Sequence, residues 1–317
     1  MAATRKPIDN RRRALLRALA AAGLGAWLAP ARGAGVPTAP ARHLFDITGQ
    51  AAGGLSLPSD VAVGRDGRVY VVDGGNHRVV VFDRGRRHLS TIGRMGAAEG
   101  QFRDPVGIGT DGGGRIYVAD SGNRRIQAFD AEGRFQHTFT VQSRGGAVRP
   151  VDVAADAAGA RLYVTGNDRV MEFDARGALQ REWGGQGEGA GEFRYPATLA
   201  VTPQGAVVVV DALNARVQVF DAAGGLRVQI GSWGVLPGQF FRPKGVALDR
   251  RGRVYVSDSY LDVIEVFSDE ARFLHVLGSG GEPQRFTSVG GIAIDGDNRL
   301  FAAEMLKHKV SVYSLGA

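Results

Sequence analysis

The sequence predicts an all-β fold, a six-bladed β-propeller of four-stranded antiparallel blades, for most of its 317 residues. Three observations predict it: a repeat that occurs six times, turn signals between short apolar runs, and an orphan strand near the N-terminus. Four short strands in a repeat of this length are typical of a propeller blade. The 47 glycines and the 44% of hydrophobic residues suit many tight turns around a large core.

The six repeat units start 45 to 47 residues apart. Their starts are Pro58, Pro105, Pro150, Pro196, Pro243 and, in the degenerate sixth unit, Ser288. Within the first unit, apolar or alternating runs cover residues 61–63, 69–72, 79–82 and 88–92. Gly, Asn and Asp separate these runs, and such residues close tight antiparallel turns because Gly and Asn tolerate positive φ.

The sixth unit has three strands, the last ending near Tyr313. Residues 43–47, ahead of the first unit, match the fourth strand of the other units. We expect this N-terminal strand to close the last blade, because closure removes an open sheet edge. The predicted propeller therefore spans residues 43–317, and we expect it to be a monomer.

Residues 1–31 have the three regions of a signal peptide: a basic start, an apolar run at 14–28 and small residues at 29–31. The segment 12–17, with its paired arginines, is typical of twin-arginine (Tat) export, and the alternative is an ordinary Sec signal. Either route predicts a periplasmic or secreted protein. Residues 32–42, rich in Pro, Ala and Gly, indicate a linker.

The formal charge of +7 belongs largely to this leader. Seven of the 39 basic residues but one of the 32 acidic residues lie within residues 1–32. The remaining chain is close to neutral, which argues against a nucleic acid partner. Because the sequence has no cysteine, disulfides, thiolate metal sites and c-type haem attachment are excluded. No later segment is apolar enough for a stable membrane span once the signal is removed.

Unit two carries a recognisable motif at residues 105–108, 114–118 and 120–126, which read PVGI, GRIYV and DSGNRRI. With the Gly-Gln-Phe and Gly-Glu-Phe segments before the next units, this pattern resembles the NHL repeat over residues 43–317. The resemblance implies a six-bladed propeller. It implies little about activity, since the family includes ubiquitin-ligase RNA readers, bacterial surface proteins and a lyase.

An Asp–Asn–Arg set recurs where the second strand turns into the third. Because a catalytic group is rarely copied into several repeats, we expect Asp and Arg to pair across the turn as a structural device. Units three, five and six degrade the set, and its loss in units five and six indicates either a specialised sector or sequence drift. The complete sets are Asp73, Asn76 and Arg78; Asp120, Asn123 and Arg125; and Asp211, Asn214 and Arg216.

Basic residues precede most units, on the face where propeller ligands usually bind. At equivalent positions around a ring, they would form a positive collar for a small anionic ligand or an acidic protein surface. The alternative is that each arginine pairs locally. The candidate ligand-binding residues are Arg103, Arg149, Arg194, Arg242, Lys244 and Arg285.

The first residues of the inner strands line the predicted central channel. In register they are Asp60, Gly107, Asp152, Thr198, Gly245 and Gly291. Asp60 and Asp152 are the candidate metal ligands, because two carboxylates with backbone carbonyls suit Ca²⁺. The alternative is two hydrated carboxylates, and we expect no other cofactor.

Two enzyme classes offer an alternative function. Similarity to peptidylglycine amidating lyase implies zinc-binding histidines after the blade-start prolines, where this chain has Ser59, Val106, Val151, Ala197 and Lys244. Similarity to lactonase-type propellers implies a channel Ca²⁺ with more acidic and amide ligands than Asp60 and Asp152 provide. The sequence therefore favours a non-enzymatic binding scaffold, which twin-arginine export associates with periplasmic redox complexes.

Overall fold

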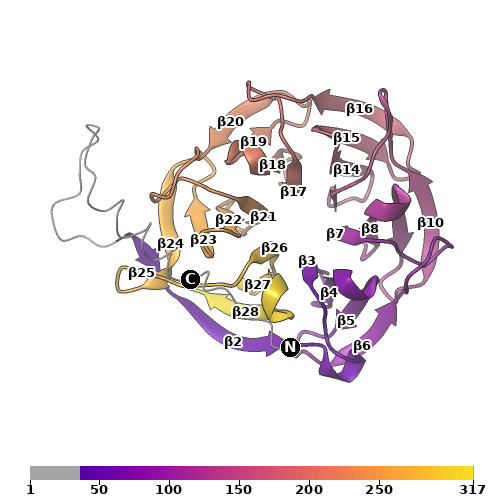
Figure 1. Cartoon of the computed structure of the whole chain (residues 1–317), viewed down its shortest axis with the longest axis horizontal. Coiled ribbons are helices and arrows are strands. Elements are labelled where there is room, and N and C mark those ends of the chain that lie inside the picture. The colour runs from indigo at the N-terminus through magenta and orange to yellow at the C-terminus, as the bar shows by residue number, and fades with distance from the viewer. Residues whose placement is uncertain (1–35, 317) are drawn as a thin grey trace, which may run out of the picture. The chain divides into compact units, whose positions relative to one another are not determined.

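The computed structural model describes residues 36–316, and the sheets in this part form a ring around a central axis (Figure 1). Six sheets each contain four antiparallel blade strands, and two short strands extend the sheet of blade five; this is the predicted six-bladed propeller. The predicted signal peptide, residues 1–31, lies outside the described residues. No helix within residues 36–316 is long and apolar enough to cross a membrane.

The blades follow one another in chain order. The strands of blades one to three are β3 (Pro58–Val63), β4 (Val69–Asp73), β5 (Arg78–Phe82) and β6 (His88–Ile92); β7 (Pro105–Thr110), β8 (Ile116–Asp120), β9 (Arg125–Phe129) and β10 (Phe135–Thr140); β13 (Asp152–Ala155), β14 (Arg161–Gly166), β15 (Arg169–Asp174) and β16 (Leu179–Gly184).

Blades four and five repeat this order, and blade six takes its fourth strand from the N-terminal side of the chain. The strands are β17 (Pro196–Val201), β18 (Val207–Asp211), β19 (Arg216–Phe220) and β20 (Leu226–Ile230); β21 (Pro243–Leu248), β22 (Val254–Asp258), β23 (Val263–Phe267) and β24 (Phe273–Ser279); β26 (Val289–Ile294), β27 (Arg299–Glu304), β28 (Lys309–Leu315) and β2 (Ala41–Ile47).

The core is divided into six apolar layers, one between each pair of neighbouring blades. The second strands are buried along their whole length in four blades, because both faces of each sheet pack against another blade. The inter-blade phenylalanines Phe102, Phe193 and Phe240 are also fully buried. These phenylalanines therefore belong to the apolar layers between blades.

The N-terminal strand β2 closes blade six by antiparallel pairing with β28, from Ala41 opposite Leu315 to Ile47 opposite Val310. A polar contact reinforces the pairing, since Lys309 Nζ lies 2.8 Å from Asp46 Oδ2. Burial alone would raise the pKa of Asp46, but hydrogen bonds from Lys309, His43 and Ser311 outweigh burial and lower this pKa to about 2. The predicted closure is confirmed.

Residues 38–42, which the sequence placed in a linker, are mostly in strands. Strand β2 starts at Ala41, before the predicted residue 43. Strand β1 (Thr38–Ala39) pairs in parallel with β24 and adds an outer strand to blade five. The linker composition did not predict β1, because this strand forms by backbone hydrogen bonds to the free edge of β24, which a segment of any composition can make.

We expect deletion of residues 36–47 to destabilise the propeller strongly, because it exposes the edge of β28 and the apolar layer containing Ile47. Deletion of residues 36–40, which removes β1 alone, is the matched control and should cost far less. Urea unfolding followed by fluorescence measures both. Equal stability of the two deletion variants would contradict closure by β2.

Candidate functional site

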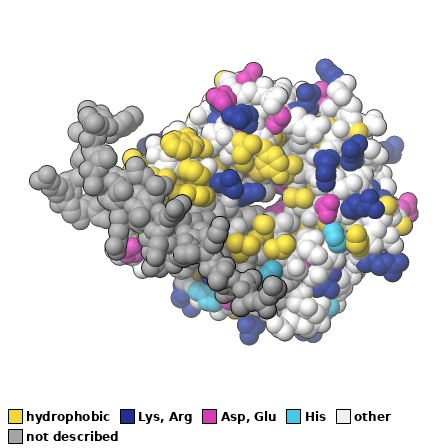
Figure 2. All heavy atoms as spheres, viewed as in Figure 1, with side chains coloured by type: hydrophobic (Ala, Val, Ile, Leu, Met, Phe, Trp, Pro, Cys, Tyr) yellow, Lys and Arg dark blue, Asp and Glu magenta, His cyan; other side chains and the backbone are white. Residues whose placement is uncertain are grey.

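The inter-blade loops and the turns between second and third strands share one face of the ring, because strands alternate in direction. We call this the loop face, and Figures 1 and 2 view it from the front. Short 3-10 helices and two-residue strands shape its loops: η1 (Gln50–Ala52), η2 (Gly74–Asn76), η3 (Ser121–Asn123), η4 (Ala212–Asn214), η5 (Met305–Lys307), β11 (Gln142–Ser143), β12 (Gly146–Ala147) and β25 (Glu282–Pro283).

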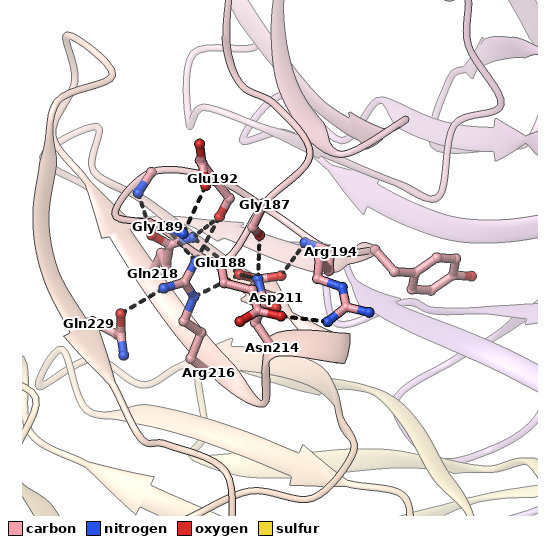
Figure 3. A network of polar contacts seen from close by, with 12 residues as sticks. Gly187, Glu188, Gly189, Glu192, Arg194, Asp211, Asn214, Arg216, Gln218 and Gln229 are labelled. Atoms are coloured by element: carbon pink, nitrogen blue, oxygen red, sulfur yellow. Dashed lines mark hydrogen bonds and ion pairs between the residues drawn. The ribbon is translucent and has the colours of Figure 1, made fainter.

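The Asp–Asn–Arg set of blade four is a buried clamp (Figure 3). Asp211 Oδ2 accepts hydrogen bonds of 2.8 Å from Asn214 and from Arg216 Nε, and Asp211 Oδ1 accepts one from the Arg194 backbone N–H. Arg216 Nη2 also donates to the carbonyls of Gly189 and Glu192. The clamp therefore joins the turn to the inter-blade loop, and it fixes the shape of the loop face.

The clamps of blades one and two have the same geometry. Asp73 and Asp120 accept from the equivalent Asn and Arg side chains and from one loop N–H, at 2.6 to 2.8 Å. The predicted Asp–Arg pairing is confirmed in all three blades. The bonds to the loop were not predicted, because the loop carbonyls that accept them carry no signal in the sequence.

We expect Arg216→Met to lower the free energy of unfolding by about 3 kcal/mol, because Asp211 stays buried without its cation. Amide exchange should also become faster in loop residues 185–195. Arg272→Met is the control: its pair with Glu270 is exposed, so its loss should cost less than about 1 kcal/mol. Equal losses in the two variants, measured by urea unfolding, would contradict the clamp.

Blade five builds its loop differently, because Val263 replaces the clamp arginine. Asp258 accepts four backbone N–H groups instead, two of them from Phe241 and Arg242 at 2.7 and 2.9 Å. Glu265 Oε2 accepts the Gly238 N–H at 2.8 Å. Burial and the nearby Asp258 charge raise the pKa of Glu265 to about 8, so this side chain is a neutral acid near pH 7.

Sequence reasoning missed Glu265, although a signal was present. Gln127 and Gln218 occupy the equivalent place in blades two and four, and each accepts a loop N–H at 2.9 Å. A protonated Glu265 can take the place of the glutamine amide, because its carboxyl group has one O–H donor and one carbonyl acceptor. The loop of blade five thus keeps its support without the arginine.

The arginines predicted as a collar all lie in loops of this face, but their expected equivalence is wrong. Arg103 and Arg194 stand two residues before the blade-start proline, whereas Arg149 and Arg242 directly precede it. Arg285 stands four residues before Val289, where β26 begins. The loops differ in length and sequence, so arginines at similar places in the chain face different surroundings.

Three of these arginines have local partners. Arg149 Nη2 lies 3.8 Å from Asp104 Oδ2, and Arg194 Nη1 lies 2.8 Å from Glu188 Oε1. Arg285 Nη1 donates to the Leu261 carbonyl at 2.8 Å. The predicted collar therefore does not carry an even ring of positive charge. Of its remaining members, Arg242 and Lys244 lie next to each other.

Lys244 is half-buried at the start of β21, and its Nζ lies 6.0 Å from the centre of the Tyr195 ring. Burial and the neighbouring Arg242 guanidinium lower the pKa of Lys244. Within residues 36–316 the structure gives Lys244 Nζ no hydrogen-bond or ion-pair partner. Its charge is thus partly withdrawn from water, and the Tyr195 ring rather than an anion faces it.

Aromatic side chains lie beside these two cations. Phe241 stacks on Tyr260 with ring centres 4.0 Å apart, and the Trp233 ring lies 5.8 Å from Phe241. Trp233 is 69% exposed and Tyr195 is 47% exposed. Figure 2 shows hydrophobic side chains around basic ones over blades four and five, beside the central opening. We call Tyr195, Trp233, Phe241, Arg242, Lys244 and Tyr260 the aromatic–basic patch.

Asp60 and Asp152, the candidate metal ligands, are buried at the start of their inner strands. Their four oxygens each accept one backbone N–H at 2.8 to 3.0 Å, including those of Ile108 in blade two and Leu199 in blade four. Gly291 provides space, since a Cβ there would lie 1.7 Å from Asp60 Oδ1. The carboxylates thus connect neighbouring blades, and the inner strands lie close together at the axis.

The two carboxyl groups also interact with each other across the channel. Burial raises the pKa of Asp60 to about 7, and burial together with the Asp60 charge raises the pKa of Asp152. Near neutral pH the pair therefore retains a proton that the unfolded chain has lost.

We expect thermal stability to fall between pH 5 and 8, because the folded state binds more protons than the unfolded state in this window. Asp152→Asn should reduce this fall, since one carboxyl group then remains, and should lower stability at pH 5 because an amide nitrogen cannot accept the backbone N–H. Asp221→Asn, an exposed group whose pKa is lowered, is the control. An unchanged pH dependence in Asp152→Asn would contradict the shared proton.

The histidines do not assemble a metal site in the described part of the chain, where no group of three or more His, Asp or Glu side chains is placed to hold a metal. His77 Nδ1 and His308 Nδ1 instead accept backbone N–H groups of Asp104 and Leu57, each at 3.1 Å. These histidines therefore support inter-blade contacts.

Comparison with known proteins agrees with this geometry. Three segments, residues 55–82, 102–129 and 193–220, match the family model of the NHL repeat. They cover the start and the clamp of blades one, two and four. No curated protein matches the sequence.

Similar solved structures show the fold. A gluconolactonase from Xanthomonas campestris is 18% identical, with 92% of this chain and 100% of that chain covered and a TM-score of 0.63. A streptogramin B lyase is 13% identical, with 87% and 97% covered and a TM-score of 0.61. The virginiamycin B lyase from Staphylococcus aureus is 14% identical, with 81% and 80% covered and a TM-score of 0.57. The chain is thus a six-bladed β-propeller that carries NHL repeats.

Proposed function

We propose that this chain is an exported, non-enzymatic binding protein whose loop face docks a partner protein. The observation that carries the proposal is the distribution of exposed large hydrophobic side chains. Among the described residues ten are exposed, and seven of these lie on the loop face. The seven are Leu57, Met95, Tyr195, Leu213, Trp233, Leu236 and Leu306.

The composition of this face supports a protein partner. Interfaces are enriched in aromatic residues, Met and Arg, and their energetic hot spots in Trp, Tyr and Arg. Arg149 and Arg194 are paired with acidic side chains of the same face, which leaves no continuous basic path for a phosphate backbone. Export rests on the leader sequence, and it would place the partner in the periplasm or outside the cell.

A channel-metal enzyme is the alternative, and the proximity of Asp60 and Asp152 is the observation in its favour. Against it, each carboxylate oxygen already accepts a backbone N–H, and within residues 36–316 no third His, Asp or Glu is placed beside the pair to complete a metal site. Metal analysis of the purified protein separates the two functions: stoichiometric Ca²⁺ that is lost in Asp152→Asn would favour the enzyme.

We expect the double variant Trp233→Ser, Leu236→Ser to weaken partner binding about 30-fold, because hot-spot aromatics contribute 2 kcal/mol or more. The measurement is quantitative capture from periplasmic extract, followed by titration of the captured protein. Leu226→Ser, Leu274→Ser is the matched control, since both leucines are exposed to a similar small extent on outer strands. Equal capture by the two double variants would overturn docking through the loop face.

A further inference from the structure

We propose that Lys244, with Tyr195 and Arg242, forms an anchor for a carboxylate side chain in an acidic, apolar segment of the partner protein. This inference rests on the proposed docking function and names the recognition chemistry of one site in it. The recognised element is a Glu or Asp side chain flanked by aliphatic or aromatic residues.

The first step of the argument is the imbalance of charge at Lys244. The other loop-face lysines are satisfied within the fold: Lys307 Nζ lies 3.3 Å from Glu304, and Lys309 Nζ lies 2.8 Å from Asp46. Lys244 Nζ instead faces the Tyr195 ring and lies near a second positive charge, the Arg242 guanidinium. A carboxylate would supply the missing charge, and such charge-assisted hydrogen bonds are the strong ones.

The second step is the rigidity of the site. The Tyr195 backbone has a positive φ of 58°, and its N–H donates to Asp168 Oδ1 at 2.8 Å. Asp258 holds the backbone N–H groups of Phe241 and Arg242. Lys244 follows directly on Pro243, whose ring fixes φ. The backbone that carries Tyr195, Arg242 and Lys244 is therefore fixed before an anion binds, which limits the ordering cost to the side chains.

The third step is the nature of the surroundings, which selects an acidic peptide over a simple anion. Phe241, Tyr260 and the exposed Trp233 extend the site away from Lys244 as an apolar surface. An anion without an apolar neighbour would leave this surface in water. A segment that alternates carboxylates with apolar side chains covers both parts of the patch.

Lysine is rare enough in this chain for a direct spectroscopic test. The full sequence has four lysines, Lys6, Lys244, Lys307 and Lys309. Reductive methylation with ¹³C-formaldehyde keeps their charge and gives one resolved NMR signal for each, assigned by single Lys→Arg variants. The probe is a short fluorescein-labelled peptide in which glutamates alternate with leucine and phenylalanine, and its partner probe has glutamine in place of glutamate.

We expect the glutamate peptide to shift the Lys244 signal and to leave the Lys307 and Lys309 signals in place. Lys244→Met should weaken peptide binding about tenfold at low salt, as loss of a charge-assisted hydrogen bond predicts. Lys307→Met, the same change on the same face, should alter affinity less than twofold. The glutamine peptide should bind the wild type and Lys244→Met equally.

Three outcomes would overturn the anchor. Equal weakening by Lys307→Met would show general electrostatic attraction, and an unmoved Lys244 signal would show that the carboxylate binds elsewhere. Stronger binding of single-stranded RNA through Lys244 would assign the site to nucleic acid. If Trp233→Ser, Leu236→Ser abolishes partner capture while Lys244→Met has no effect, the anchor fails and the docking function stands.

Discussion

The ring of blades is closed by one contact between the two ends of the propeller, the antiparallel pairing of β2 with β28. The pairing completes blade six and buries Ile47 between blades six and one. Every other feature follows from the closed ring. The channel exists because six inner strands meet at the axis, and the loop face exists because six loops emerge on one side.

The loops gain their shape from buried polar groups rather than from apolar packing alone. In blades one, two and four an aspartate joins a turn to the preceding loop through an asparagine and an arginine. Blade five lacks the arginine and uses Asp258 and Glu265 with backbone donors. The same blade, with the loop that precedes it, carries most of the aromatic–basic patch.

The repeat made most of the fold predictable from sequence. The strand pattern and the inter-blade phenylalanines Phe102, Phe193 and Phe240 recur with the period, and the closing strand was found because the sixth unit lacked its fourth strand. The site was less predictable, because its contacts join residues far apart in the chain. Arg149 and Asp104 pair between the loops that precede blades three and two, so this pairing cannot be read from either loop alone. Strand β1 has two residues, too few for any periodic signal.

The position of β2 also orders events during synthesis. The four main strands of each of blades one to five are contiguous, so a ribosome delivers them together and they can pair as they emerge. Blade six joins residue 41 to residue 315, and its outermost strand must wait for β28, which is translated last among the strands. Until Leu315 has emerged, the sheet edges flanking the gap stay unpaired. A chaperone that shields the early segment containing β2 would therefore protect the nascent propeller from aggregation during its most exposed interval.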